Sequence, residues 1–196
     1  EGGGQLGDQG SLGGATVVDT RVENGIIYHL TEGSLPIGEI SGVVSWGRRR
    51  QLMDHHTAVH VVGGSARTLL GPHIWQAGSN KGARYARIDL THHSRLSRDD
   101  LNRIEDHSNE VIAANTAVEK LVMSRAEADE AYGFELYQGG PPKNSEIRVI
   151  RIGDHDVQAC GGTHHDNVGN IGELRIIRSS QVQDGVERLQ IVAGDT

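Results

Sequence analysis

The stretch Asp54-His55-His56-Thr57-Ala58-Val59-His60 organises this chain of 196 residues, together with Cys160-Gly161-Gly162-Thr163-His164. On a helix, His56 and His60 lie one turn apart on the same face, so both imidazoles can reach one cation. Cys160 is the only cysteine, which excludes an internal disulfide, and it stands in a glycine turn. One thiolate and three imidazoles form a ligand set that suits zinc, whereas a solvated pair of helical histidines is the alternative. The predicted ligands are His56, His60, Cys160 and His164.

Three motifs in this order resemble the alanyl-tRNA synthetase editing domain and its free-standing relatives, the AlaX trans-editing proteins. They are Glu1-Gly2-Gly3-Gly4-Gln5-Leu6-Gly7-Asp8-Gln9-Gly10, His56-Thr57-Ala58-Val59-His60 and Cys160-Gly161-Gly162-Thr163-His164. Val44-Ser45-Trp46-Gly47-Arg48-Arg49 and Trp75-Gln76-Ala77-Gly78 resemble the archaeal type. Threonyl-tRNA synthetase editing domains share the metal motifs but not the glycine–glutamine opening, which ranks them lower.

The composition indicates an intracellular, globular protein. The chain has 36% hydrophobic residues, yet no apolar run approaches the roughly 20 residues needed to cross a bilayer. The glycine-rich start is unlike a secretory signal, so we expect a cytoplasmic location and no membrane partner. Because the sequence opens at Glu1, inside a motif, we expect it to be a piece of a longer protein.

The formal net charge of −7 argues against a protein that wraps nucleic acid indiscriminately. Basic residues nevertheless gather locally, and the alternatives are a solvated charged face or contacts with RNA phosphates. They are Arg48-Arg49-Arg50, Lys81, Arg84 and Arg87.

The pattern of elements predicts an α+β fold in two units. Residues 1–50 read as a small β-barrel-like unit carrying the Gly-Gly-Gln motif, in which Asn24-Gly25 joins two strands as a hairpin. Residues 51–196 read as an α/β editing unit with a zinc site and a mostly antiparallel sheet.

Within the second unit, the helix of the first histidine motif should start at Asp54 as N-cap and end near Leu70, followed by a loop over 71–82. Ser97 should cap a helix that continues to about Val122, because apolar residues recur there near the helical period. A short helix over 124–131 follows. The predicted strands are 83–90, 146–152, 156–159, 172–178 and 186–192.

The resemblance implies an aminoacyl-tRNA deacylase that hydrolyses Ser-tRNA(Ala) and Gly-tRNA(Ala), with Zn²⁺ as cofactor and the tRNA(Ala) acceptor end as partner. ATP binding would belong to the parent ligase. Two alternatives remain: a free-standing AlaX protein, and a zinc-braced tRNA-binding module without catalysis. Four protein ligands are typical of structural zinc, so catalysis requires that Cys160 or His164 be weakly bound or replaced by water. Zinc then either lowers the pKa of that water or anchors the terminal adenosine.

Backbone N–H groups at Gly161 and Gly162 could hold an oxyanion beside the metal. Gln76 resembles the polar pocket residue of the family and is assigned to the serine hydroxyl, against the alternative of a surface-loop glutamine. Val59 stands where the family often has a threonine, which places more of the discrimination on Gln76. The predicted catalytic residues are Thr57, Gln76, Cys160, Gly161 and Gly162. The predicted substrate-binding residues are Gly3, Gly4, Gln5, Val59, Gln76 and Thr163.

Overall fold

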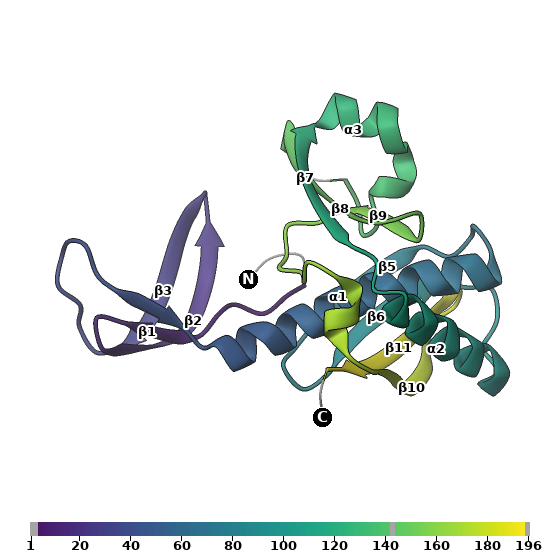
Figure 1. Ribbon diagram of the computed structural model, residues 1–196, viewed down its shortest axis with the longest axis horizontal. Coiled ribbons are helices and arrows are strands. Elements are labelled where there is room, and N and C mark those ends of the chain that lie inside the picture. Colours follow the sequence, from purple (N-terminus) through teal and green to yellow (C-terminus); the bar gives the residue numbers. More distant parts are fainter. Residues whose placement is uncertain (1–3, 142–143, 195–196) are drawn as a thin grey trace.

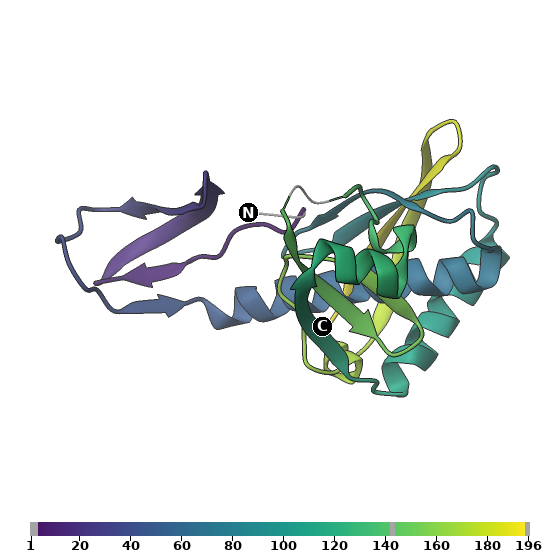
Figure 2. The ribbon, with the colours of Figure 1, turned by 90° about the horizontal axis from the view of Figure 1, so that it is seen from above.

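The computed structural model describes residues 4–141 and 144–194. Helix α1, Trp46–Leu70, runs through the molecule and links an N-terminal sheet to the remaining elements (Figure 1). Seen from above, the N-terminal sheet projects from one end of α1, and the other two sheets surround its opposite half (Figure 2). The fold is α+β, as predicted, and the strand pairs within its three sheets are antiparallel.

The N-terminal sheet has the order β3-β2-β1-β4. Its strands are β1 Gly10–Leu12, β2 Ala15–Glu23, β3 Ile26–Glu32 and β4 Gly42–Val44. The predicted hairpin turn is confirmed, with Asn24 at φ 52° and Gly25 at φ 78°, as a two-residue turn of this type requires. Within the described residues, β3 and β4 are free edges, so the predicted barrel-like unit is instead an open sheet.

Helix α1 begins at Trp46, earlier than predicted, so Asp54 is not its N-cap. Strand β4 ends at Val44, and Ser45 is still extended. The arginines that follow are good helix formers, so the helix begins directly after Ser45. Asp54 is instead buried in mid-helix. The predicted boundary at residue 50 falls inside α1, and the division into two units stays a prediction.

The central sheet has the order β10-β11-β6-β5, and α1 and α2 pack together with it. The elements are β5 Gln76–Lys81, β6 Ala86–Thr91, α2 Arg98–Ala113, β10 Leu174–Gln183 and β11 Val186–Ala193. Buried aliphatic side chains from α1, α2, β6 and β11 form one core, to which β8 adds two isoleucines. This core fixes the position of the buried half of α1.

Two predicted boundaries in this region are wrong. The predicted loop over 71–82 contains β5, whose sequence Gln-Ala-Gly-Ser-Asn-Lys lacks apolar alternation and is held by pairing with β6. The predicted helix to Val122 ends at Ala113, and Asn115 adopts a left-handed φ of 52° that helices do not continue through. Val118–Ser124 forms β7, because its backbone pairs with β8 in an antiparallel ladder.

The third sheet, β7-β8-β9, carries α3 on one side (Figure 1). Its further elements are β8 Glu146–Ile152, β9 Asp156–Ala159 and α3 Arg125–Tyr132, with short 3₁₀ turns η1 Phe134–Leu136 and η2 Val168–Ile171. The bounds of β8 and β9 are those predicted. Among the described helices, none is both long enough and apolar enough to span a membrane.

Candidate metal centre

Helix α1 and the turn after β9 bring the four predicted ligands together. His56, His60, Cys160 and His164 each offer one ligand atom, and these atoms all lie within 4.8 Å of one another. The Sγ atom of Cys160 is 3.3 Å from Nε2 of His56 and 3.4 Å from Nε2 of His164. Tetrahedral bonds of about 2.0–2.3 Å to nitrogen and sulfur place neighbouring ligand atoms about 3.3–3.6 Å apart. The cluster therefore has the composition and spacing to hold a metal ion.

The three histidines are oriented by partners outside the cluster. Nδ1 of His56 is 2.7 Å from Oε1 of Gln5, Nδ1 of His60 is 2.9 Å from Oδ2 of Asp156, and Nδ1 of His164 is 3.2 Å from Oγ1 of Thr57. These contacts direct Nε2 of each ring toward the cluster, as the distances from Cys160 show for two of them. Partners of this kind fix the tautomer of a ligating histidine.

Burial and close contacts set the ionisation of the cluster. Burial lowers the pKa of His56 and of His164 well below its usual value, so both rings are neutral and can donate a lone pair. Burial also lowers the pKa of His60, but hydrogen bonds to Asp156 and Cys160 outweigh it and raise that pKa to about 9. Burial by itself would raise the pKa of Cys160. The hydrogen bond to His60 and the charges around the thiol outweigh burial, so the pKa of Cys160 is lowered. A lowered thiol pKa favours the thiolate that metals bind.

The opening motif joins the site through Gln5. The backbone of Gly4 and Leu6 pairs with Lys81 at the edge of β5, through bonds of 2.7 and 3.3 Å. Oε1 of Gln5 accepts from the backbone N–H of Thr163 at 3.0 Å, and Nε2 donates to Oγ1 of Thr163 at 2.8 Å. Gln5 thus ties the helix histidine to the cysteine turn. Gly4 has φ 77°, and a Cβ there would lie 2.6 Å from the backbone oxygen of Ser79.

One side of the cluster opens to a pocket of about 310 Å³. His56, His60 and Cys160 form part of its wall, and Gln76 and Gly161 line it as well. The pocket therefore brings together three predicted ligands and two further predicted catalytic residues, since Cys160 is assigned to both sets. Further polar lining side chains are Ser79, Lys81, Gln138 and Gln158.

Other predicted residues lie behind the ligands, and within the described part of the chain none of them lines this pocket. Thr57 is fully buried against His164, and Thr163 is held by Gln5. Val59 lies in the aliphatic core. The backbone N–H of Gly162 donates a hydrogen bond to the Cys160 sulfur, so it points toward the sulfur and not into the pocket. The predicted Gly3 lies outside the described residues.

Several residues of the site were missed by sequence reasoning. Asp156 holds His60, and Gln158 donates to both oxygens of Asp156 at 3.1 and 3.0 Å. Arg148 donates to the backbone oxygens of Cys160 and Gly162 at 3.2 and 2.5 Å, which fixes the cysteine turn. The available signal was the pair of polar side chains on the inward-facing positions of β9, where apolar residues are expected.

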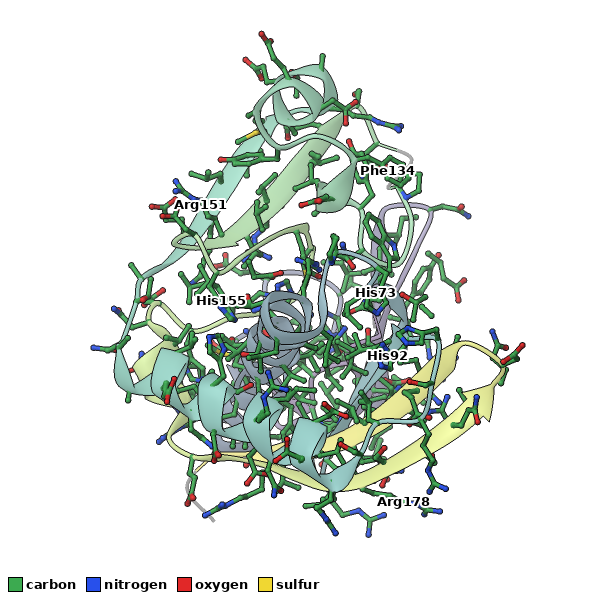
Figure 3. All side chains as sticks on the ribbon, turned by 90° about the vertical axis from the view of Figure 1, so that its right-hand side faces the viewer. His73, His92, Phe134, Arg151, His155 and Arg178 are labelled. Carbon is green, nitrogen blue, oxygen red and sulfur yellow. The ribbon has the colours of Figure 1, made fainter. Side chains whose placement is uncertain are left out.

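A larger pocket of about 610 Å³ lies on the other side of Asp156. Arg67, Arg151 and His155 are among its lining residues, and the last two are labelled in Figure 3. Oδ1 of Asp156 is 3.5 Å from Nη1 of Arg67 in this pocket, whereas its Oδ2 is 2.9 Å from Nδ1 of His60, which lines the smaller pocket. None of the four ligands lines the larger pocket, and we place the candidate site in the smaller one.

Comparisons with known proteins identify relatives of this chain. A family model described as "Threonyl and Alanyl tRNA synthetase second additional domain" matches residues 147–190, which include Asp156 and the cysteine turn. The chain is 45% identical over 200 residues to the alanine–tRNA ligase of Natronomonas pharaonis, with 100% of this chain and 21% of that protein covered. Over its whole length, the chain is similar to one segment of alanine–tRNA ligases. The enzymes of Methanopyrus kandleri and Halobacterium salinarum are 44% and 46% identical, covering 100% and 99% of this chain and 22% and 21% of theirs.

Alanine–tRNA ligase relatives match the chain from end to end, so the relationship extends beyond the segment that the family model covers. The predicted resemblance to the archaeal synthetase editing domain is confirmed. The chain spans about a fifth of the length of these relatives.

Proposed function

We propose that this chain hydrolyses the ester bonds of Ser-tRNA(Ala) and Gly-tRNA(Ala) as the editing domain of an alanyl-tRNA synthetase, with zinc as its metal. The observation that carries the proposal is that three of the four ligands line an open pocket with polar side chains. A zinc ion that only stabilises the fold needs no such opening, because structural zinc sites are closed. The alternative of a binding module without catalysis is therefore less well supported.

His56, His60, Cys160 and His164 would hold the ion. When bound, zinc would supply Lewis acidity, which lowers the pKa of a nearby water toward about 7, or an anchor for the terminal ribose. Three nitrogen donors and one sulfur donor favour zinc over magnesium or calcium, which prefer oxygen ligands.

Cys160 is the ligand best placed to give way to substrate or water. It is half-buried and lines the pocket, whereas His164 is buried and does not line it. Of the two ligands that sequence reasoning left open, we therefore assign the exchangeable position to Cys160. The hydrogen bonds from Arg148 to the flanking carbonyls hold the turn in place while the thiolate moves.

Gln76 is the residue that we assign to the serine hydroxyl. It stands at the start of β5, and its backbone N–H donates to Oε1 of Gln138 at 2.9 Å, which fixes its position on the pocket wall. Correct Ala-tRNA(Ala) would place a methyl group against the Gln76 amide in place of that hydroxyl, whereas glycine has no side chain and leaves room for a water to pair with the amide. An unpaired polar group in a desolvated pocket is costly, so hydrogen bonding discriminates better than fit alone.

Gly161 supplies the backbone edge that faces the pocket, and a Cβ there would meet no atom within 4 Å. Its N–H is a candidate donor to the oxyanion that develops when water adds to the ester carbonyl. Lys81 adds a positive charge to the same wall, and burial lowers the pKa of its amine to about 8. We infer that these two groups and Gln76 orient an ester that is already activated.

The specificity of Gln76 is testable with two substrates. Gln76→Ala should slow hydrolysis of Ser-tRNA(Ala) by about ten- to a hundredfold, the effect of losing one hydrogen bond of about 1.5–3 kcal/mol. Hydrolysis of Gly-tRNA(Ala) should change far less, because glycine has no hydroxyl to lose. Initial rates of both reactions measure the difference.

Gln183→Ala is a matched control, since Gln183 is exposed at the far end of β10. It should leave both rates unchanged, and zinc content should be the same in all three proteins. Equal loss on both substrates in Gln76→Ala would instead assign Gln76 to the shared ribose or water. The absence of any deacylation above background in the parent protein would favour the binding module.

A further inference from the structure

A second histidine cluster lies away from the metal centre, at the surface where α1 leads into β5. His73, His92 and His93 each offer one nitrogen, and these atoms lie within 4.8 Å of one another. Nε2 of His73 is 2.8 Å from Nδ1 of His92, and the centroids of the His92 and His93 rings are 4.5 Å apart. Figure 3 shows His73 and His92 beside each other on this face of the molecule.

The backbone under this cluster is held on both sides. The carbonyl of His73 accepts a hydrogen bond of 2.6 Å from Oγ1 of Thr91, the last residue of β6. The N–H of Trp75 donates to the same Oγ1 at 2.8 Å, and the N–H of His92 donates to the carbonyl of Gly185 at 2.9 Å. The two segments that supply the histidines are therefore fixed against each other before any ligand arrives.

We propose that His73, His92 and His93 form a second metal site, which takes a borderline divalent transition ion such as Zn²⁺ or Ni²⁺. Three imidazoles are the donor set that such ions prefer, whereas Mg²⁺ and Ca²⁺ require oxygen ligands. The 2.8 Å between the two nearest nitrogens opens to about 3.3 Å with a small rotation of an exposed ring, which is the separation that a tetrahedral site needs. The remaining coordination positions face solvent, because two of the three residues are exposed.

The hydrogen-bonded pair of His73 and His92 does not by itself explain why His93 packs against both rings, at centroid distances of 5.5 and 4.5 Å. A bound ion would clamp the segment 71–75 to the end of β6. That segment leads directly into Gln76 on the pocket wall, so the second site would stiffen one side of the candidate pocket. The metal-binding inference itself does not depend on the proposed function.

Zinc titration tests this site. The protein is loaded with one equivalent of zinc, freed of excess metal, and titrated with ZnCl₂ against a chromophoric chelator of micromolar affinity. We expect one further equivalent to bind in the micromolar range. His73→Ala and His92→Ala should each weaken this second event by at least about tenfold, since two ligands hold an ion poorly.

His29→Ala is the matched control, because His29 is exposed on the N-terminal sheet and belongs to neither cluster. It should bind the second equivalent with unchanged affinity, and millimolar Mg²⁺ should not compete. Circular dichroism of each variant checks that the fold is retained. The proposal is overturned if the parent protein binds no second equivalent, or if folded His73→Ala and His92→Ala bind it as tightly as the parent.

Discussion

At the scale of single residues, the candidate metal centre depends on a glycine as much as on its predicted ligands. A Cβ at Gly162 would lie 2.0 Å from Cε1 and 2.3 Å from Nδ1 of the His56 ring, whereas at Gly161 it would meet nothing within 4 Å. Gly162→Ala should therefore displace His56 and weaken zinc binding by at least about tenfold, and Gly161→Ala should not. Competition with a zinc chelator measures both. Equal zinc affinity in the two variants would show that His56 is not held as described.

The clustering of the four predicted ligands could be anticipated from the sequence because helical spacing places His56 and His60 on one face, and a glycine turn presents Cys160. Their outer partners could not, because Asp156 meets His60 only after β9 packs beside α1. The spacing also does not show what covers each face of a buried helix. For this reason Val59, one residue before His60, was assigned to the pocket although its side chain lies in the core.

At the scale of elements, the organising feature is a helix that is buried on all sides from Asp54 to Ala66. Its polar side chains are satisfied by distant partners. Oδ1 of Asp54 is 2.6 Å from Nε2 of His165, and Nδ1 of His55 donates to the carbonyl of Gly82 at 2.6 Å. Buried polar groups without such partners would destabilise the fold.

Gly64 marks a close approach of His155 to this helix. A Cβ at Gly64 would lie 2.6 Å from Nε2 and 2.7 Å from the backbone oxygen of His155, whereas at Gly63 the nearest atom would be 3.5 Å away. Gly64→Ala should lower the free energy of unfolding by about 1–3 kcal/mol through overpacking. Gly63→Ala should be neutral or stabilising by up to about 1 kcal/mol, because alanine is the better helix former. Urea unfolding of both variants checks this, and similar values for the two would contradict the packing.

Element boundaries were predictable where a local signal exists. Ser97 forms a capping box with Asp100, and α2 begins directly after it, as predicted. The start of α1 and the strand β5 lack such signals. Gln76–Lys81 becomes a strand only because Ala86–Thr91 pairs with it. The apolar repeat that predicted a helix to Val122 was overridden by pairing with β8.

At the scale of the whole molecule, the candidate metal centre joins segments from three parts of the chain: Gln5 near the start, α1, and the turn after β9. A bound ion stabilises the native state by its binding free energy, because the unfolded chain offers no preformed site. Removal of zinc with a chelator should therefore lower Tm by several degrees, and returning one equivalent should restore it. Differential scanning calorimetry measures the shift. An unchanged Tm after verified zinc removal would contradict a site that spans these segments.

Cys160 distinguishes a catalytic zinc from a structural one. Cys160→Ala should abolish hydrolysis of Ser-tRNA(Ala) while the far-UV circular dichroism stays close to that of the parent, because three buried histidines with their outer partners remain. A purely structural zinc predicts the opposite order, with unfolding first. Loss of the native circular dichroism signal in Cys160→Ala would therefore count against the assignment.

The most direct test of the central claim, that the four ligands and the pocket beside them form a zinc-dependent ester hydrolase, is the initial rate of Ser-tRNA(Ala) hydrolysis by the zinc-loaded, zinc-stripped and reloaded protein. The account predicts that stripping lowers the rate by at least about a hundredfold, and that one equivalent of zinc restores it. Circular dichroism before each assay establishes that the stripped protein is folded. A folded, zinc-free protein that hydrolyses Ser-tRNA(Ala) at the loaded rate would contradict the claim.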